Sequence, residues 1–150
     1  MANVKVGDEA PDFTLRDENN QEVKLSSLRG TPVVLVFYPL DFSGRCTSEM
    51  CAIRDDYSAF QERGATVFGI SRDSMFSHKA FIEKEALKHS LLADMKGEVA
   101  RLYGCWNEAA GVAERMTVVI DKDGIIQYVI HNNAGQVRDH KEAIAALAGD

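Results

Sequence analysis

The sequence predicts an α/β domain in which a mixed β-sheet carries helices on both faces. Three observations lead to this fold class. A continuous apolar run, Val33 to Tyr38, has the length and the β-branched and aromatic content of a central strand that is buried on both sides. Helical and strand patterns alternate after this run, and a hairpin pattern stands near each end of the chain. A length of 150 residues fits one domain, and we assign residues 1–150 to it.

The first expected element is a short antiparallel hairpin. Residues 13–15 and 23–25 alternate apolar and polar side chains, as strands with one buried face do. Residues 17–21 between them are rich in turn-forming side chains. A turn over residues 26–30 then leads to the central strand.

Helices and strands are expected to alternate through the middle of the chain. Residues 46–63 have the pattern of a helix that ends at Gly64. The elements expected next are a strand over residues 65–71, a helix capped by Asp73 or Ser74 and running to about Leu87, a weak strand over residues 90–93 and a short helix over residues 96–103.

A second hairpin and a helix complete the expected fold. Residues 116–120 and 125–130 have the apolar content of strands, and Asp121-Lys122-Asp123-Gly124 between them is a tight-turn signal. Val137, Ile144 and Leu147 lie on a last amphipathic helix.

Composition and charge exclude several classes of protein. The chain has 17 basic and 23 acidic residues, and the resulting charge of −6 argues against binding to nucleic acid or to an anionic membrane. Its 3 cysteines are too few, and odd in number, for a disulfide scaffold, and they indicate a reducing compartment. The first residues lack an apolar signal core, and the longest apolar run, residues 32–40, is too short for a membrane helix. We therefore expect a cytoplasmic protein.

Cys46 stands at a position that activates thiols. The central strand ends near Pro39, a loop follows, and Cys46 falls at the start of the next expected helix. The first turn of a helix presents unpaired backbone N–H groups and the positive end of the helix dipole, and both favour the thiolate, which is the reactive form. Ligands of open α/β sheets also bind beyond the carboxyl ends of the strands, where this loop must lie.

A helical projection separates Cys46 from Cys51. Apolar side chains of the same helix, Met50 and Ile53 among them, fall within about 40° of Cys46, whereas Cys51 lies about 140° around the helix. The two thiols are about 7.5 Å apart along the axis at 1.5 Å per residue. A disulfide needs Cα atoms within roughly 7 Å and converging side chains. A Cys46–Cys51 disulfide therefore requires the first turns of the helix to unwind.

Each cysteine and histidine also has a plainer interpretation. A lone cysteine is usually a small buried apolar residue. By position alone, packing explains Cys46 as well as reactivity does, and it is the better explanation of Cys51. Cys105 has no recognisable context, and we interpret it as structural or incidental. The 4 histidines lack metal-ligand spacing and are interpreted as surface or hydrogen-bonded side chains.

The segment around Cys46 resembles the peroxiredoxin active-site motif, Pro-x-x-x-Thr/Ser-x-x-Cys, with Pro39, Ser43 and Cys46 at its fixed positions. The resemblance covers nearly the whole chain, because residues 8–15 and 115–121 also look like segments of that family at the expected intervals. It implies a thioredoxin-like fold, with a central mixed sheet flanked by helices and an N-terminal hairpin.

The resemblance implies a role for several residues. Cys46 looks like the peroxidatic cysteine, which Pro39 would shield from solvent. Ser43 takes the place of the usual threonine, whose hydroxyl hydrogen-bonds the peroxide. Arg115 matches the arginine that faces the thiolate and the peroxide oxygens, and Glu49 matches a glutamate that orients such an arginine in some subfamilies. By themselves, Arg115 would be interpreted as a solvated surface residue and Glu49 as a partner of the helix dipole.

Two subfamilies share features with this chain. Cys46 and Cys51, together with residues 52–55, resemble the bacterioferritin-comigratory or Q-type peroxiredoxins, in which the second cysteine resolves the sulfenic acid as an intramolecular disulfide. Residues 102–111 look more like the alkyl hydroperoxide reductase E type, whose members often work with one cysteine and a small-thiol or redoxin reductant. We favour Cys51 as the resolving cysteine. The typical two-cysteine dimer mechanism is not expected, because the sequence shows no carboxy-terminal resolving cysteine.

The expected function is a thiol peroxidase for hydrogen peroxide and organic hydroperoxides, recycled by a thioredoxin-like or low-molecular-weight thiol reductant. A one-cysteine peroxidase recycled by an external thiol or redoxin, and a peroxide-sensing redox protein that uses the same cysteine, remain alternatives. The loop before Cys46 weakens a third, a glutathione-peroxidase-like enzyme. Nothing in the sequence implies a metal, haem or flavin. The family also implies a possible homodimer beside the active site, near Phe42.

Overall fold

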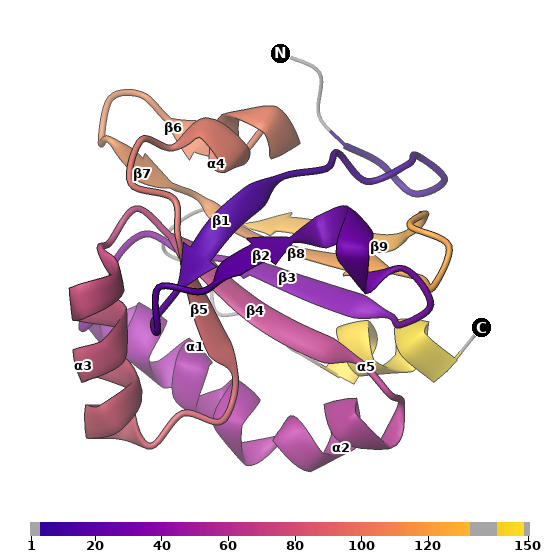
Figure 1. Ribbon diagram of the computed structural model, residues 1–150, viewed down its shortest axis with the longest axis horizontal. Coiled ribbons are helices and arrows are strands. Elements are labelled where there is room, and N and C mark those ends of the chain that lie inside the picture. The colour runs from indigo at the N-terminus through magenta and orange to yellow at the C-terminus, as the bar shows by residue number, and fades with distance from the viewer. Residues whose placement is uncertain (1–3, 133–140, 149–150) are drawn as a thin grey trace.

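The computed structural model describes residues 4–132 and 141–148. At its centre is a seven-stranded sheet in the order β2-β1-β5-β4-β3-β8-β9 (Figure 1). The strands are β1 (Thr14–Asp17), β2 (Glu22–Lys24), β3 (Val33–Phe37), β4 (Thr66–Ser71), β5 (Ser90–Ala93), β8 (Arg115–Ile120) and β9 (Ile126–Asn132). Strands β3, β4 and β5 run parallel, while β1, β2, β8 and β9 pair antiparallel with their neighbours. The predicted α/β class with a mixed sheet is confirmed.

Helices lie on both faces of the sheet, but unequally. One face packs against α1 (Gly44–Asp55), α2 (Tyr57–Glu62), α3 (Met75–Glu85) and α5 (Lys141–Ala148) (Figure 1). The other packs against α4 (Glu98–Tyr103), the 3-10 helix η1 (Leu25–Leu28) and the segment that leads into β1. The sheet thus separates two apolar cores.

Strand β3 contributes to both cores. Val34 and Val36 point to the core beneath α1, while Leu35 and Phe37 point to the core beneath α4. Because successive side chains of a strand alternate between faces, a strand that is covered on both sides must be apolar throughout. All five residues of β3 are buried, as the continuous apolar run predicted.

One predicted helix is divided in two. The pattern predicts a single helix over residues 46–63, but α1 ends at Asp55 and α2 begins at Tyr57. Asp56 between them has φ −95° and ψ 7°, outside the helical range. Aspartate favours helix ends over helix interiors, and this explains where the break falls. The apolar face continues across it, since Ile53 and Phe60 are both fully buried.

Most other elements fall where the sequence predicts them. The N-terminal hairpin is β1–β2, and the Ser74 side chain caps α3 by accepting the N–H of Ser77 at 3.2 Å. A small hairpin of β6 (Trp106–Asn107) and β7 (Val112–Ala113) was not predicted. Its two-residue strands are too short to show an alternation of apolar and polar side chains. In α5 Leu147 is buried, whereas Val137, predicted on the same helix, lies outside the described residues.

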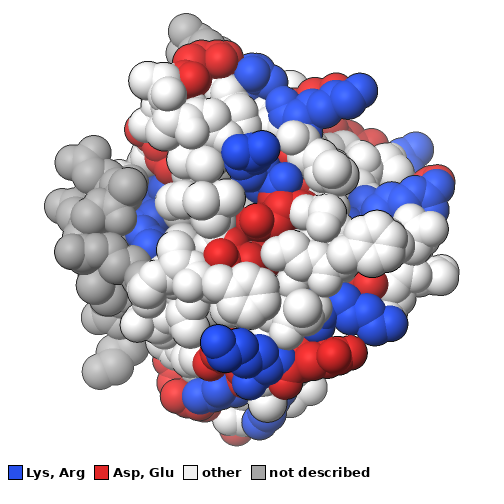
Figure 2. All heavy atoms as spheres, turned by 90° about the vertical axis from the view of Figure 1, so that its left-hand side faces the viewer, with Lys and Arg blue, Asp and Glu red and all other residues white. Residues whose placement is uncertain are grey.

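The described surface mixes charges of both signs. On the face shown in Figure 2, lysine and arginine side chains are interspersed with acidic ones rather than gathered into one region. No helix within residues 4–132 and 141–148 is long and apolar enough to cross a membrane. In the same residues, no group of three or more His, Cys, Asp or Glu side chains is arranged to bind a metal ion.

Candidate active site

Cys46 lies in the first turn of α1, just beyond the carboxyl end of β3. Ser43 occupies the N-cap position with an extended backbone (φ −71°, ψ 149°), and its carbonyl oxygen accepts the N–H of Thr47 at 2.8 Å. The Cys46 side chain is fully buried and packs with Met50 and Ile53. The predicted position at a helix start, in line with the apolar face, is confirmed.

The register of the sheet brings Arg115 to the same place. Strands β3 and β8 pair antiparallel, with Phe37 opposite Met116. The start of β8 is therefore adjacent to the end of β3, where the loop towards α1 begins. Arg115 is the first residue of β8, so residues far apart in the sequence meet at this edge of the sheet.

Arg115 links the thiol to a carboxylate. Its Nη2 donates to Sγ of Cys46 at 3.3 Å, and its Nη1 donates to Oε1 of Glu49 at 2.9 Å. Glu49 lies one helical turn after Cys46, on the same side of α1. The side chains of Arg115 and Glu49 are each only 3% exposed, and such buried charges are stable only when paired. The interpretation of Arg115 as a solvated surface residue is wrong, and the position of Glu49 matches that of an arginine-orienting carboxylate.

The loop from β3 to α1 contains the remaining residues of the motif. Pro39 and Ser43 are half-buried, and the Ser43 hydroxyl donates to the carbonyl of Leu40 at 3.0 Å. Phe42 has a left-handed backbone (φ 66°), which is uncommon for a residue other than glycine. Its ring packs on Phe81 of α3, with the ring centroids 5.0 Å apart. This contact attaches the loop to α3 shortly before the chain reaches Cys46.

A buried polar network beneath this loop was not evident from the sequence. The Asp41 carboxylate accepts the hydroxyls of Tyr38 at 2.5 Å and Ser77 at 2.9 Å. His78 places Nδ1 at 2.8 Å from the same carboxylate and Nε2 at 3.0 Å from the carbonyl oxygen of Leu92. Burial, and then the Asp41 carboxylate, raise the pKa of Tyr38 well above its ordinary value. A single sequence gives no spacing signal for the pair, because Asp41 and His78 are 37 residues apart.

Cys51 is turned away from Cys46, as the helical projection predicted. It is half-buried, and its Sγ lies 3.5 Å from Oε1 of Glu85, the last residue of α3. Arg54, one turn further along α1, donates through Nη1 to the carbonyl of Glu85 at 2.6 Å. Burial, and then the hydrogen bond to Glu85, raise the pKa of the Cys51 thiol. All 3 cysteines lie in the described part of the chain, and none forms a disulfide.

Cys105 belongs to the opposite side of the molecule. It follows α4 and is buried in the core beneath that helix, together with Phe37 and Tyr103. The sheet therefore separates it from Cys46, which packs in the other core. This position agrees with the structural interpretation of Cys105.

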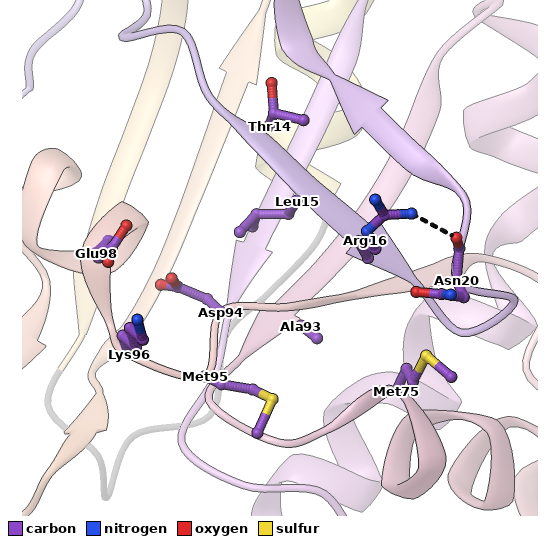
Figure 3. Close-up of a pocket in the computed structure, with 10 residues that line it drawn as sticks. All are labelled: Thr14, Leu15, Arg16, Asn20, Met75, Ala93, Asp94, Met95, Lys96 and Glu98. Carbon is purple, nitrogen blue, oxygen red and sulfur yellow. Dashed lines mark hydrogen bonds between the residues drawn. The ribbon is translucent and has the colours of Figure 1, made fainter.

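A separate pocket of about 410 Å³ contains none of these residues (Figure 3). It is lined by Thr14, Leu15, Arg16, Asn20, Met75, Ala93, Asp94, Met95, Lys96 and Glu98. Two of its charged side chains make hydrogen bonds within the fold: the Asp94 carboxylate accepts the N–H groups of Val99 and Ala100, and Arg16 donates to the carbonyl of Asn20. The candidate site residues Cys46, Arg115 and Glu49 do not line this pocket.

Comparisons with known proteins agree with this geometry. The sequence model of the AhpC/TSA family matches residues 6–129. The chain belongs to this family, the peroxiredoxins. Among curated peroxiredoxins, chloroplastic peroxiredoxin Q of Oryza sativa subsp. japonica is 44% identical over 138 residues, which are 91% of this chain and 63% of the relative. Chloroplastic peroxiredoxin Q of Sedum lineare is 42% identical over 141 residues, covering 93% and 75% of the two chains.

Solved peroxiredoxins share the fold. The crystal structure of peroxidoxin BcpB from Mycobacterium tuberculosis superposes with a TM-score of 0.88 at 34% identity, covering 97% of each chain. The thioredoxin-like fold implied by the resemblance is thereby confirmed. The chain spans 63% of the length of the rice peroxiredoxin Q, less than two thirds.

Proposed function

We propose that this chain is a thiol peroxidase in which Cys46 attacks the peroxide. The observation that supports it best is the N–H that Arg115 donates to Sγ of Cys46 at 3.3 Å in a buried site. A guanidinium donor and the start of a helix both favour negative charge on the sulfur, and the thiolate is the nucleophile. Glu49 keeps the guanidinium in this orientation through its second nitrogen.

The first half-reaction is a displacement at oxygen. The Cys46 thiolate attacks one oxygen of the hydroperoxide, an S–O bond forms, and the O–O bond breaks. Its electron pair leaves with the second oxygen, which takes up a proton and departs as water or an alcohol. The sulfur is oxidised to a sulfenic acid while the peroxide is reduced by two electrons. Arg115 and backbone N–H groups at the start of α1 stabilise the charge on the leaving oxygen.

The two other motif residues shape the approach of the peroxide. Ser43 directs its hydroxyl at the peroxide by turning away from the carbonyl of Leu40, its partner in the structure. Pro39 shields the sulfur from solvent. Hydrogen peroxide and organic hydroperoxides are the proposed substrates.

Cys51 is the proposed resolving residue. Its thiolate attacks the sulfenic sulfur of Cys46, a disulfide forms, and the hydroxyl leaves as water after it takes up a proton. A thioredoxin-like protein then reduces the disulfide by two electrons. Two relatives with 42% and 44% identity are named peroxiredoxin Q, the type that this pair of cysteines resembles.

A one-cysteine cycle is the second candidate, because the structure turns Cys51 towards Glu85 rather than Cys46. In that cycle an external thiol reduces the Cys46 sulfenic acid directly. Mass spectrometry after one equivalent of peroxide separates the two. A Cys46–Cys51 disulfide is expected, and a persistent sulfenic acid with a free Cys51 thiol would refute the resolving role.

Two cysteine variants test the peroxidase itself. Cys46→Ser should not consume peroxide, whereas Cys51→Ser should react once and then turn over slowly or overoxidise. Sustained consumption by the wild type with a thioredoxin-like reductant is expected. Arrest after one equivalent would identify a peroxide sensor instead.

Location and assembly stay proposals as well. A cytoplasmic location is proposed because 3 cysteines, too few for a disulfide scaffold, indicate a reducing compartment. A homodimer would form beside the loop that exposes Leu40 and Phe42, which are 38% and 45% exposed. Sedimentation that shows only monomer at high micromolar concentration would contradict it.

A further inference from the structure

We propose that Glu85, at the end of α3, is a positioning residue for the resolving step. Together with Arg54, it holds the part of α1 that contains Cys51 against α3. This inference rests on the proposed resolving role of Cys51. In the fastened state Cys51 stays a thiol that faces away from Cys46. Opening of the contact is then part of the route to the disulfide.

Two hydrogen bonds to Glu85 join α1 to α3. The Glu85 side chain lies 3.5 Å from Sγ of Cys51, and the Glu85 carbonyl accepts Nη1 of Arg54 at 2.6 Å. Glu85 is half-buried and ends α3, and the chain turns directly after it through Ala86 in a left-handed conformation (φ 52°). Both bonds therefore join the second half of α1 to one defined point of another element.

The disulfide cannot form while Cys51 keeps its bond to Glu85. Cys46 and Cys51 lie on different sides of α1, so α1 must unwind between them before the sulfurs can meet. Unwinding moves Cys51 away from the Glu85 carboxylate and strains the Arg54 bond. The observed resolving rate is then the product of the fraction of opened molecules and the rate of sulfur attack within them.

The environment of Cys51 also slows formation of the disulfide, because its net effect keeps the thiol protonated. Glu85 faces the thiol from α3, while Arg54 and Asp55 face it from α1 itself. Burial and both carboxylates raise the pKa of Cys51, and Arg54 lowers it. A thiol kept protonated cannot attack the sulfenic sulfur, because the thiolate is the nucleophile.

The same contact sets how long the sulfenic acid persists. A sulfenic acid that waits for a second thiol can meet a second peroxide and become a sulfinic acid. A tighter α1–α3 contact therefore favours overoxidation, and a looser one favours the disulfide. Glu85 would thus determine the partition between these two fates without touching the peroxide.

Glu85→Gln tests the inference, with Glu83→Gln as the matched control. Glu83 is an exposed acidic residue on the same helix, two positions earlier. The substitution at Glu85 removes charge but keeps the shape and the backbone bond to Arg54. A fall in thiol pKa raises the thiolate fraction more than it lowers nucleophilicity, and with a looser contact the disulfide should form about three to ten times faster at neutral pH.

Three readouts are needed. Rapid quenching and mass spectrometry give the rate of disulfide formation and the sulfinic fraction of Cys46 at high peroxide. The pH dependence of Cys51 alkylation, measured in a Cys46→Ser background, gives the thiol midpoint without any peroxide chemistry. In Glu85→Gln this midpoint should move to lower pH, disulfide formation should be faster and the sulfinic fraction smaller, while Glu83→Gln matches the wild type.

A second variant separates the effect of the α1–α3 contact on the disulfide rate from the effect of charge on the pKa of Cys51. Arg54→Met removes the bond to the Glu85 carbonyl and also a charge that lowers the pKa of Cys51. Its alkylation midpoint should rise, yet above that midpoint its disulfide should form faster than in the wild type. If Glu85 and Arg54 had a purely structural role, the Cys51 alkylation midpoints of Glu85→Gln and Arg54→Met would both equal that of the wild type.

The outcomes are distinguishable. If the wild type forms the Cys46–Cys51 disulfide but Glu85→Gln forms it no faster than Glu83→Gln, the inference is overturned and the proposed function stands. If the wild type forms no such disulfide, the resolving role fails and the inference falls with it. The alkylation midpoints are measured in either case, because they require no disulfide.

Discussion

At the scale of single residues, the proposed reactivity of Cys46 depends on the paired charges of Arg115 and Glu49. Arg115 is the donor that faces the sulfur, so Arg115→Met should reduce the second-order rate of the peroxide step by about 100- to 1000-fold, as loss of a positioned donor does. Stopped-flow measurement of a single turnover gives this rate. Arg101→Met, which removes an exposed arginine that pairs with Glu108, is the control and should react like the wild type.

The same substitution also tests stability, because it leaves the Glu49 carboxylate buried without its guanidinium partner. Loss of one member of a buried ion pair lowers the free energy of unfolding by about 3–5 kcal/mol. The double variant Arg115→Met with Glu49→Leu should regain most of that stability but none of the activity. A double variant that regains activity would show that the guanidinium serves the fold rather than the chemistry.

At the scale of elements, the buried network of Asp41 joins the loop before Cys46 to α3. His78→Phe removes the ring nitrogen 2.8 Å from the Asp41 carboxylate, and both side chains are fully buried. A buried acceptor that loses a donor lowers the free energy of unfolding by about 2–3 kcal/mol. Urea denaturation measures the change. His131→Phe removes a half-exposed pairing with Glu114 and should change stability by less than about 1 kcal/mol. Equal effects of the two substitutions would contradict the importance of the network.

Helix α1 is the element that must change during the proposed cycle. Backbone amides of residues 47–54 should exchange with deuterium faster in the disulfide form than in the reduced form, because the disulfide requires unwound turns. Hydrogen-exchange mass spectrometry measures this, with the amides of the central strand β4 as internal reference. Equally slow exchange in both forms would show that the thiols meet without unwinding.

The sequence predicts features that depend on local pattern, and it misses those that depend on contact between elements. The all-apolar strand β3 and the start of α1 near Cys46 follow from periodicity and helix-start chemistry, and both are confirmed. The break at Asp56 escapes prediction because the apolar face continues across it. The role of Arg115 could be inferred from family resemblance alone, since sheet register decides which residue lies beside the thiol.

The contacts of Asp41 and Glu85 also depend on contact between elements and could not be predicted from the sequence. Asp41 meets His78 only because α3 packs beside the loop after β3, and Glu85 meets Cys51 only because α3 ends beside α1. Neither pair has a sequence spacing that any periodicity would reveal. Tertiary packing thus supplies the groups that surround Cys46 and Cys51.

At the scale of the whole molecule, each apolar core contains a buried tyrosine whose ionisation opposes folding. Tyr38 lies in the core beneath α1 and Tyr103 in the core beneath α4, where its hydroxyl donates to the carbonyl of Pro11 at 2.7 Å. Burial raises the pKa of both phenols above the ordinary value of 10.0. The native protein therefore keeps both protons at a pH where the unfolded chain has lost them.

The free energy of unfolding should accordingly fall as the pH rises above about 10, by about 1.4 kcal/mol per pH unit for each tyrosine. Below that pH both states are protonated and the two phenols contribute no pH dependence. Tyr103→Phe should cost about 1 kcal/mol at pH 8 through the lost hydrogen bond to Pro11. The variant should nevertheless lose stability less steeply than the wild type between about pH 10 and 11, because one of the two ionisations is gone. Urea denaturation across this range measures the slope, and identical slopes for the two proteins would show that Tyr103 ionises as readily in the folded core as in the unfolded chain.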